Sequence, residues 1–400
     1  MKAYAIRCEN DLRIAEDLLS DVLVKRTKAD LDRMTEKGPI GVRRRLLSSS
    51  VRLSRSMSPS VHKMADHCVQ TLGVEIPLEL YAYASPQFNA ACFKPEDGRL
   101  FVIFSSSLLE AFDENELMFV VGHELGHHVY QHHDIPVGYI TNGQQRVPAS
   151  LALQLFAWTR YAEISADRAG AFCANDLGVV AQALFKLASG LSSERIVSFN
   201  LPDFLKQMDE MQTVDAEPGQ GAPVEDWFST HPFSPLRVKA LQLFHQSGLM
   251  LNGGIEKAEL EIGVQGMMGL MEPNYLEGRT EVAKIMGQLF IAGAIAVANA
   301  RDGIGEEEKS VLKEFMGEAF SLDILKIDKL IDTLPKRIGS VKQHASITQR
   351  MQVVRDLSVV ARAEGGITDN ELLVLYAIAD GLEIPRSLVM HILDGDAGLD

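Results

Sequence analysis

Apolar residues along most of the chain recur at helical spacing. Residues 9 to about 73 predict helices that break near Gly38-Pro39 and again near Ser58-Pro59. Proline lacks the backbone donor that a helix interior needs, so each pair indicates a helix end. The N-terminal part of the chain is therefore expected to be helical.

The spacing changes to that of strands after residue 73. Leu78 to Ala84 and Leu100 to Phe104 are short runs rich in β-favouring residues, with the turn Pro95-Glu96-Asp97-Gly98 before the second. Ala90 to Phe93 fits a further strand across that turn and would complete a hairpin. We expect a small antiparallel or mixed sheet here.

Helical spacing returns after the strands. The expected helices cover residues 114–132, 149–175, 179–187, 203–211 and 235–245. Residues 214–224 form a loop rich in proline and glycine. Residues 248–277 are rich in glycine and methionine without clean periodicity, and we interpret 251–277 as a linker or lid between domains.

From about residue 278 the pattern is wholly helical and contains an internal repeat. The segment ARDGI at 300–304 matches AEGGI at 363–367, and Glu308 matches Glu371. In each copy an apolar helix ends at a glycine turn and another begins, with Thr368 a suitable N-cap. Two such helical hairpins would form a compact bundle. The fold class expected for the whole chain is α+β, mainly α.

Length and charge limit the classes of protein. At 46% hydrophobic content, 400 residues favour two domains, and the formal charge of −15 argues against general nucleic-acid binding. One basic segment opposes this balance, because ten Lys or Arg stand against three Asp or Glu between Lys25 and Arg55. It is either a solvated helix face or a patch for an anionic membrane or a partner protein.

The cysteines and the apolar segments indicate a cytoplasmic protein. The four cysteines are Cys8, Cys68, Cys92 and Cys173. They form no C-x-x-C pair, so we expect buried free thiols in a reducing compartment. The N-terminus carries charges where a signal peptide needs an apolar run. The most apolar segment, Ile285 to Ala298, contains Gln288 and is too short to span a bilayer, which favours a buried helix.

The candidate chemistry begins with the pentapeptide HELGH, an H-E-x-x-H motif. His123 and His127 are four residues apart and share a helix face, so both can bind one zinc ion. Glu124 projects beside them and can accept a proton from water. Asp113, with Glu116 three residues on, predicts a capping box at the start of this helix.

A catalytic zinc ion takes three protein ligands and leaves a position for water. His133 is one candidate for the third ligand, as in the longer motif H-E-x-x-H-x-x-G-x-x-H. That motif has glycine where this chain has Tyr130, and glycine lets the chain leave the helix sharply. With Tyr130 we expect the helix to continue and to point His133 away from the metal.

Glu163 is the other candidate, on the next long helix. Asp167 stands four residues later, so the two carboxylates share a face. One can bind zinc while the other accepts a hydrogen bond from a ligating imidazole. Alternatively, both acids are exposed and pair with Arg160 and Arg168.

These residues give the chain a specific resemblance. H-E-x-x-H, E-x-x-A-D and the sequence Thr230-His231-Pro232 followed by Arg237 are similar to the HtpX-like and CAAX-prenyl-protease-like zinc metallopeptidases, of the gluzincin group. The resemblance covers about residues 45–247. It implies a zincin-like metallopeptidase domain over 45–250, preceded by a helical segment at 1–44.

The resemblance also implies roles for residues of this chain. His123, His127 and Glu163 would bind one zinc ion, and Glu124 would be the catalytic base. Asp167 would orient a ligating histidine. His231 and Arg237 would face the reacting carbonyl or hold the site together, although His231 is otherwise a structural loop residue. Asn89 precedes a strand that resembles the family's substrate edge strand, so protein or peptide substrates are expected.

Residues 278–400 resemble the TerB-like (tellurite-resistance-associated) domain through the repeats at 300–308 and 363–371. This resemblance implies an association with stress responses and metal binding. The acids that could collect a cation, or simply complement helix dipoles, are Asp302, Glu306, Glu307, Glu308, Glu364 and Asp369. Unlike the integral-membrane relatives, the chain is expected to have no membrane span.

Two functions are open at this point. The first is a zinc-dependent metalloendopeptidase regulated by its C-terminal helical domain. The second is a stress-associated sensor or docking protein, in which that domain is the active part and the protease is latent beneath residues 248–277.

Overall fold

The computed structural model divides into two compact units. The residues it describes are 2–36, 41–141, 149–192, 197–214, 231–268, 281–300, 327–345, 347–361 and 367–394. The first unit comprises Met1–Glu210 and Phe228–Val264, and the second comprises Met211–Trp227 and Gln265–Asp400. The first therefore includes residues 1–44. A small mixed sheet among many helices confirms the expected α+β, mainly α, class.

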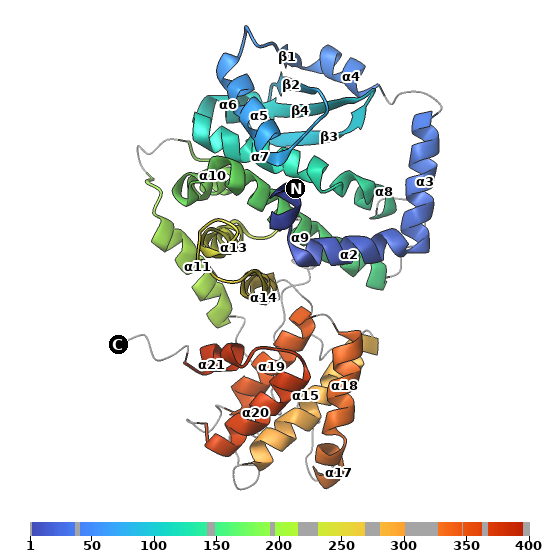
Figure 1. Ribbon diagram of the computed structural model, residues 1–400, viewed down its shortest axis with the longest axis vertical. Coiled ribbons are helices and arrows are strands. Elements are labelled where there is room, and N and C mark those ends of the chain that lie inside the picture. The colour runs from blue at the N-terminus through green and yellow to red at the C-terminus, as the bar shows by residue number, and fades with distance from the viewer. Residues whose placement is uncertain are drawn as a thin grey trace. The chain divides into compact units, whose positions relative to one another are not determined.

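Four strands form the sheet, in the order β1-β2-β4-β3 (Figure 1). Their bounds are β1 Val51–Leu53, β2 Leu78–Tyr83, β3 Ala90–Glu96 and β4 Arg99–Ser105. β2 and β4 are parallel, while β1–β2 and β3–β4 are antiparallel. Asp97 and Gly98, both at positive φ, form the tight turn of the predicted hairpin. β3 is an edge strand of this sheet.

One strand was not predicted. Val51–Leu53 lies inside the region for which we expected only helices, yet it pairs with β2 as β1. Three residues are too few to establish a period of two, so the helical spacing around them dominates the pattern.

The sheet lies at one end of the first unit, and most of the unit's helices lie below it in the view of Figure 1. The helix bounds are α1 Lys2–Ile6, α2 Glu9–Ser20, α3 Val22–Glu36, α4 Val42–Ser49, α5 Pro59–Leu72, α6 Ser106–Ala111, α7 Glu114–Val129, α8 Val137–Thr141, α9 Ala149–Ala174, α10 Leu177–Ser189, α11 Leu201–Val214, α13 Ser234–Gln246 and α14 Lys257–Met268, with a 3-10 turn η1 at His132–Asp134. The last four residues of α11 and of α14 belong to the second unit. α7 packs against α9, α5 and β3.

Small residues bring α7 and α9 close together. A Cβ atom added at Gly122 would lie 2.9 Å from the Cα of Gly170, and one added at Gly126 would lie 2.9 Å from the Cβ of Ala169. Real Cβ atoms do not approach other atoms so closely, so a larger side chain would force the two helices apart. The close contact places the H-E-x-x-H motif of α7 beside the acids of α9.

The end of α7 differs from our prediction. The helix was expected to run to residue 132 through Tyr130, but it ends at Val129. The left-handed residue is Gln131, at φ 60°, one position later than the glycine of the longer motif. Tyr130 is buried, and its hydroxyl donates to the carbonyl of Ala3 at 2.9 Å. This tertiary contact accompanies the helix end, which sequence spacing alone does not indicate.

Part of the segment interpreted as a linker or lid is a packed helix. Lys257–Met268 forms α14, and Glu261 on it is 3% exposed. Arg168 of α9 donates to Glu261 at 2.6 Å, and the thiol of Cys8 donates to the same carboxylate at 3.3 Å. A buried ion pair of this kind is costly to break. The first half of α14 is thus an integral part of the first unit.

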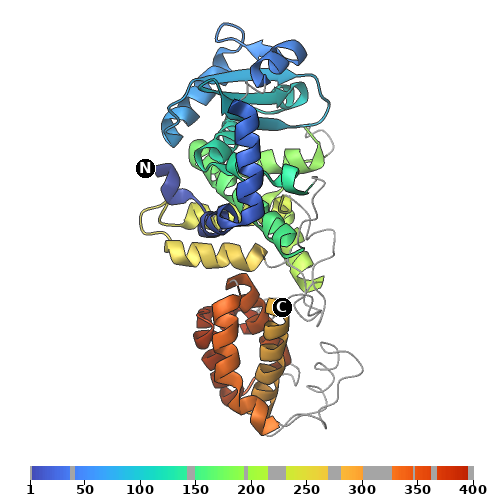
Figure 2. The same ribbon diagram turned by 90° about the vertical axis from the view of Figure 1, so that its right-hand side faces the viewer.

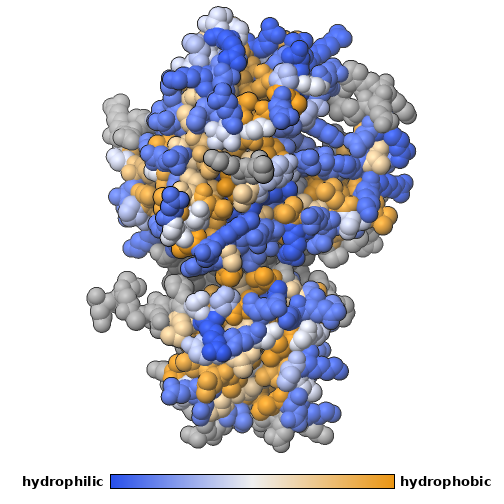
Figure 3. Space-filling view, viewed as in Figure 1, coloured by the Kyte–Doolittle hydropathy of each residue, from blue (hydrophilic) through white to orange (hydrophobic). Residues whose placement is uncertain are grey.

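The described part of the second unit consists of helices (Figure 2). They are α15 Glu281–Asn299, α17 Ile327–Asp332, α18 Leu334–His344, α19 Ile347–Ala361, α20 Asp369–Gly381 and α21 Arg386–Asp394. α15 packs against α17, α18, α19 and α20, so it is the central helix. Apolar side chains also gather on the face of this unit seen in Figure 3, and Leu373 is 63% exposed.

The central helix corrects one argument from the sequence. α15 is longer than the fourteen residues considered there, and Val282–Asn299 is long and apolar enough to cross a membrane by length and composition. The core helix of a soluble protein passes the same test, and 56% of this window is buried. Leu289, Phe290 and Ile295 have no exposed surface.

The internal repeat lies largely outside the described residues, which omit 301–326 and 362–366. Asp302, Glu306, Glu307, Glu308 and Glu364 therefore have no structural account. Thr368 caps α20 as expected, and Glu371 completes a capping box with it.

Candidate metal centre

Helix α7 places both motif histidines on one side. Asp113 caps its N-terminus, accepting from the amides of Asn115 and Glu116, and Glu116 completes the predicted capping box. The Nε2 atoms of His123 and His127 face each other at 3.2 Å. Each ring uses its Nδ1 atom in another contact, so both Nε2 atoms face the same point and can bind one metal ion there.

The carboxylate of Glu163 meets these two nitrogens from α9. Its oxygens lie 3.5 Å from His123 Nε2 and 3.4 Å from His127 Nε2. Within the part of the chain that the structure describes, these three residues form a group whose ligand atoms all lie within 4.8 Å. The two distances involve different oxygens, Oε2 toward His123 and Oε1 toward His127, so the carboxylate faces both imidazoles at once. Two imidazole nitrogens and a carboxylate are a ligand set that zinc takes. Among the residues that the structure describes, the buried Oε2 of Glu163 has no hydrogen-bond partner, which also fits a metal ligand.

A direct carboxylate supports His123. Its Nδ1 atom lies 2.9 Å from Oδ1 of Asp167, which is fully buried. Arg237 of α13 donates to both oxygens of Asp167, at 2.7 and 2.6 Å. Although burial acts to raise it, the charge and hydrogen bonds of Arg237 hold the pKa of Asp167 at about 2. Asp167 thus remains an anion that can accept the Nδ1 proton of His123.

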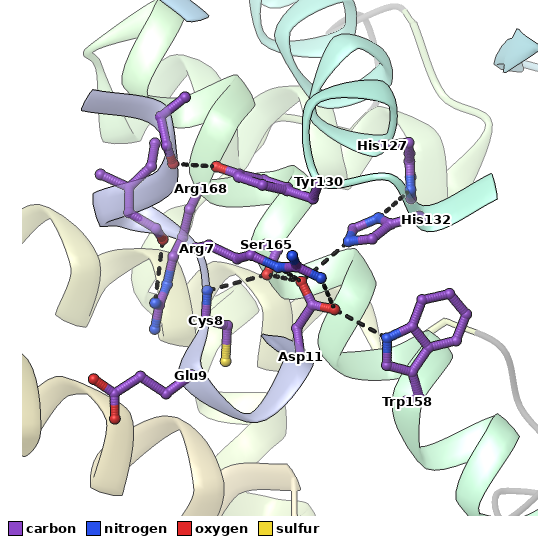
Figure 4. A network of polar contacts seen from close by, with 12 residues as sticks. Arg7, Cys8, Glu9, Asp11, His127, Tyr130, His132, Trp158, Ser165 and Arg168 are labelled. Atoms are coloured by element: carbon purple, nitrogen blue, oxygen red, sulfur yellow. Dashed lines mark hydrogen bonds and ion pairs between the residues drawn. The ribbon is translucent and has the colours of Figure 1, made fainter. Parts of the chain in front are cut away.

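A second imidazole supports His127. Its Nδ1 atom lies 2.9 Å from Nδ1 of His132, in η1. His132 Nε2 lies 3.0 Å from Oδ2 of Asp11, on α2 (Figure 4). Neither Asp11 nor His132 was predicted. His132 carries no signal beyond its proximity to the motif, and nothing in the spacing links it to a residue more than a hundred positions away.

The protonation states of the two motif histidines differ. Burial and the neighbouring imidazoles of His123 and His132 lower the pKa of His127 well below its usual range. Burial also acts to lower the pKa of His123, but the hydrogen bond to Asp167 and the charge of Glu163 raise it above the usual value. Metal binding requires neutral imidazole, a form that His127 already holds near neutral pH.

Glu124 lies between the metal group and the sheet edge. Burial and the charge of Glu163 raise its pKa, against the opposing effects of His123, the backbone amide of Cys92 and Arg237. Cys92 belongs to β3, so the edge strand lies directly beside Glu124. A carboxylate with a raised pKa is a stronger base than an exposed one.

The remaining predicted residues are placed as follows. His231 Nε2 lies 3.6 Å from Oε1 of Glu163, and its side chain is 63% exposed. Thr230 lies outside the described residues. Asn89 stands one residue before β3, where its amide donates to Ser105 Oγ at 3.0 Å and its side chain donates to the hydroxyl of Tyr83 at 3.0 Å.

Two alternatives from the sequence differ from this geometry. His133 lies in η1 and is not part of the three-residue group. Arg168 pairs with Glu261 rather than with Asp167 or Glu163. The arginine beside both acids is Arg237, whose guanidinium also lies 3.6 Å from Glu163.

Comparison with known proteins agrees with the chemistry of these residues. Residues 56–244 match the profile of Peptidase family M48. By this match and the relative described next, the segment is similar to M48 metallopeptidases, a family of hydrolases that generally use zinc.

One relative is the plastoglobule-localized metallopeptidase 48, chloroplastic, of Arabidopsis thaliana. It is 31% identical over 182 residues, which are 43% of this chain and 52% of the relative. The chain therefore spans about half the length of the curated relative it matches. No solved structure matches the chain.

Proposed function

We propose that this chain is a zinc-dependent metalloendopeptidase in which His123, His127 and Glu163 hold one zinc ion. The observation that carries the proposal is the convergence of both Nε2 atoms and the carboxylate of Glu163, with their ligand atoms within 4.8 Å of one another. When bound, the ion supplies Lewis-acid activation of water and of the scissile carbonyl. Glu124 takes the proton from that water and then delivers it to the leaving amine.

The other residues of the site bind and orient. Among the described residues β3 is the last strand of the sheet on the side of Glu124, where an extended peptide would add by main-chain hydrogen bonds. Asn89, just before β3, would help to position that peptide. His231 is exposed near Glu163 and would donate to the oxyanion that develops during hydrolysis. Arg237, bound to Asp167, would hold the site together rather than contact the substrate.

Zinc content per chain tests the metal site without a known substrate. We expect about one zinc per purified chain by mass spectrometry and a clear loss in Glu163→Ala. Glu124→Gln should keep its zinc and lose nearly all hydrolysis of a denatured protein substrate, because the amide cannot accept a proton. A parent chain without zinc after zinc is added would refute the site. Retained proteolysis in Glu124→Gln would refute the role of Glu124.

The second unit, which resembles a TerB-like domain, would regulate the protease. This proposal is supported by the apolar core that the second unit forms around α15, which makes it a compact unit of its own. A chain that ends after Met268 retains the buried Glu261 contact and should hydrolyse the substrate at a different rate from the full chain. Equal rates would remove the regulatory role. Because the comparisons match the peptidase segment, they favour hydrolysis over a docking function.

We further propose a cytoplasmic location, with peripheral membrane contact through the basic segment at residues 25–55. Four buried free cysteines fit a reducing compartment. Arg44 and Arg52 are exposed, beside the exposed apolar side chains of Leu47 and Val51. Fractionation of cells, and sedimentation with anionic and neutral vesicles, would test the two points separately.

A further inference from the structure

The polar chain behind His127 leads out of the segment that matches the peptidase family. From His127 it passes through His132 and reaches Asp11 of α2 (Figure 4). The matched segment begins only at residue 56. The N-terminal helices therefore touch the candidate metal centre through a chain of two hydrogen bonds.

Zinc binding fixes the direction of this chain. A metal at His127 Nε2 leaves its Nδ1 atom protonated, so that atom donates to Nδ1 of His132. A neutral His132 that accepts at Nδ1 must carry its proton on Nε2. That proton is donated to Asp11, which as a carboxylate can only accept. Each donor thus meets an acceptor. If His132 instead carried its proton on Nδ1, that proton would point at the Nδ1 proton of His127.

Asp11 is held as an acceptor from every side. Its Oδ2 atom accepts from Arg7 Nε at 2.8 Å and from Ser165 Oγ at 2.7 Å, besides His132. Its Oδ1 atom accepts from Arg7 Nη2 at 3.1 Å and from Trp158 Nε1 at 3.0 Å. Asp11 and Ser165 have no exposed surface. So many donors around one carboxylate leave it no freedom to rotate.

The same carboxylate links both helices that carry the ligands. Ser165 stands two residues after Glu163 on α9, and its hydroxyl also accepts from the backbone amide of Cys8 at 3.1 Å. His132 follows the end of α7, which carries His127. Asp11 therefore constrains two of the three ligands from one point.

We propose that Asp11, acting through His132, is a positioning residue of the zinc site. It would fix His132 in its Nε2–H tautomer, and His132 would in turn fix His127 with Nε2 toward the metal. The inference rests on the proposed zinc site. It assigns α2 a role in that site, because Asp11 lies on this helix.

Zinc affinity of the full-length chain tests the proposal. The dissociation constant is measured by competition with a chromophoric chelator, so that no substrate is needed. Asp11→Asn and His132→Phe should each raise it about 10–100-fold, the usual effect of removing a partner behind a ligating histidine. Asparagine places a donor among donors, and phenylalanine keeps a ring between Tyr130 and Trp158 but offers no nitrogen.

Two further variants separate positioning from packing. His132→Gln offers an oxygen to His127 and an amide to Asp11, so it should recover much of the affinity that His132→Phe loses. Leu18→Ala removes a fully buried side chain of the same helix without touching the polar chain. Its zinc affinity should stay close to that of the parent. An equal loss in Leu18→Ala and Asp11→Asn, or in His132→Gln and His132→Phe, would overturn the proposal.

The tautomer is directly observable. In the zinc-loaded chain, long-range proton–nitrogen spectra of the histidine rings should show His132 protonated at Nε2 alone. Protonation at Nδ1 would overturn the proposal, as would parent-like affinity in both Asp11→Asn and His132→Phe. If instead the parent binds no zinc, or Glu163→Ala binds as tightly as the parent, the zinc site itself fails.

Discussion

The two motif histidines are supported in different ways. Behind His123 a buried carboxylate, Asp167, accepts directly and is clamped by Arg237. Behind His127 an imidazole stands between the ring and the carboxylate of Asp11, which Arg7 clamps in turn. The first arrangement uses residues within the peptidase segment, and the second draws on the N-terminal helices. The candidate metal centre would therefore draw one support from residues of the peptidase segment and another from a distant part of the chain.

The largest expected effect is the loss of Arg237. Arg237→Ala leaves Asp167 fully buried with its main counter-charge removed, so we expect the metal-free chain to lose about 3–5 kcal/mol of unfolding free energy. Arg7→Ala should cost less, about 1–3 kcal/mol, because Asp11 keeps the donors of His132, Trp158 and Ser165. Urea unfolding of both variants measures the difference. Equal losses would mean that the two sides are clamped alike.

The pH dependence of stability follows from the low pKa of Asp167. The pKa is about 2 in the folded chain against an ordinary 3.8, so ionised Asp167 stabilises the fold above about pH 4. This contribution, about 2 kcal/mol, is lost as the pH falls through the folded pKa. Between pH 4 and pH 2 the unfolding free energy of metal-free Asp167→Asn should therefore fall less steeply than that of the parent. Parallel curves would contradict the assigned shift.

A smaller effect tests whether the two sides act independently. Asp167 and Asp11 share no hydrogen-bond partner within the described part of the chain, so their contributions to zinc affinity should add. The double variant Asp167→Asn/Asp11→Asn should lose the sum of the single losses in binding free energy, to within about 0.5 kcal/mol. A larger difference between the double loss and this sum would show that the two histidine ligands adjust to one another. The two supports would then not be independent.

The sequence predicted the residue that supports His123 but not the residues that support His127. Asp167 could be found because Glu163 and Asp167 are four residues apart on a helix with a regular period. The small residues that let α7 approach α9 are also local in sequence. Asp11 could not be found in this way, because its place beside His132 depends on how α2 packs against α9. No spacing rule encodes a contact between residues so far apart.

The end of α7 was predicted wrongly because of one residue, Tyr130. Tyr130 predicted a continuing helix, because that position lacks glycine. The chain turned at Gln131 instead, with Tyr130 buried against the N-terminal segment. This turn lets His132 reach back to His127, so the misplaced helix end and the missed support have the same cause.

The smallest expected effect concerns His133, the neighbour of His132. His133 lies apart from the metal group and lines a separate cleft with Lys94 and His128. Burial and the nearby imidazoles lower its pKa to about 4, so it is neutral near pH 7. His133→Ala should leave zinc affinity and zinc content unchanged, whereas His132→Phe one residue away should weaken binding about 10–100-fold. Both variants alter one histidine of the same short turn, so a general disturbance of η1 would affect them alike. Loss of zinc in His133→Ala with retention in Glu163→Ala would instead make His133 the third ligand, as in the metzincin-like class.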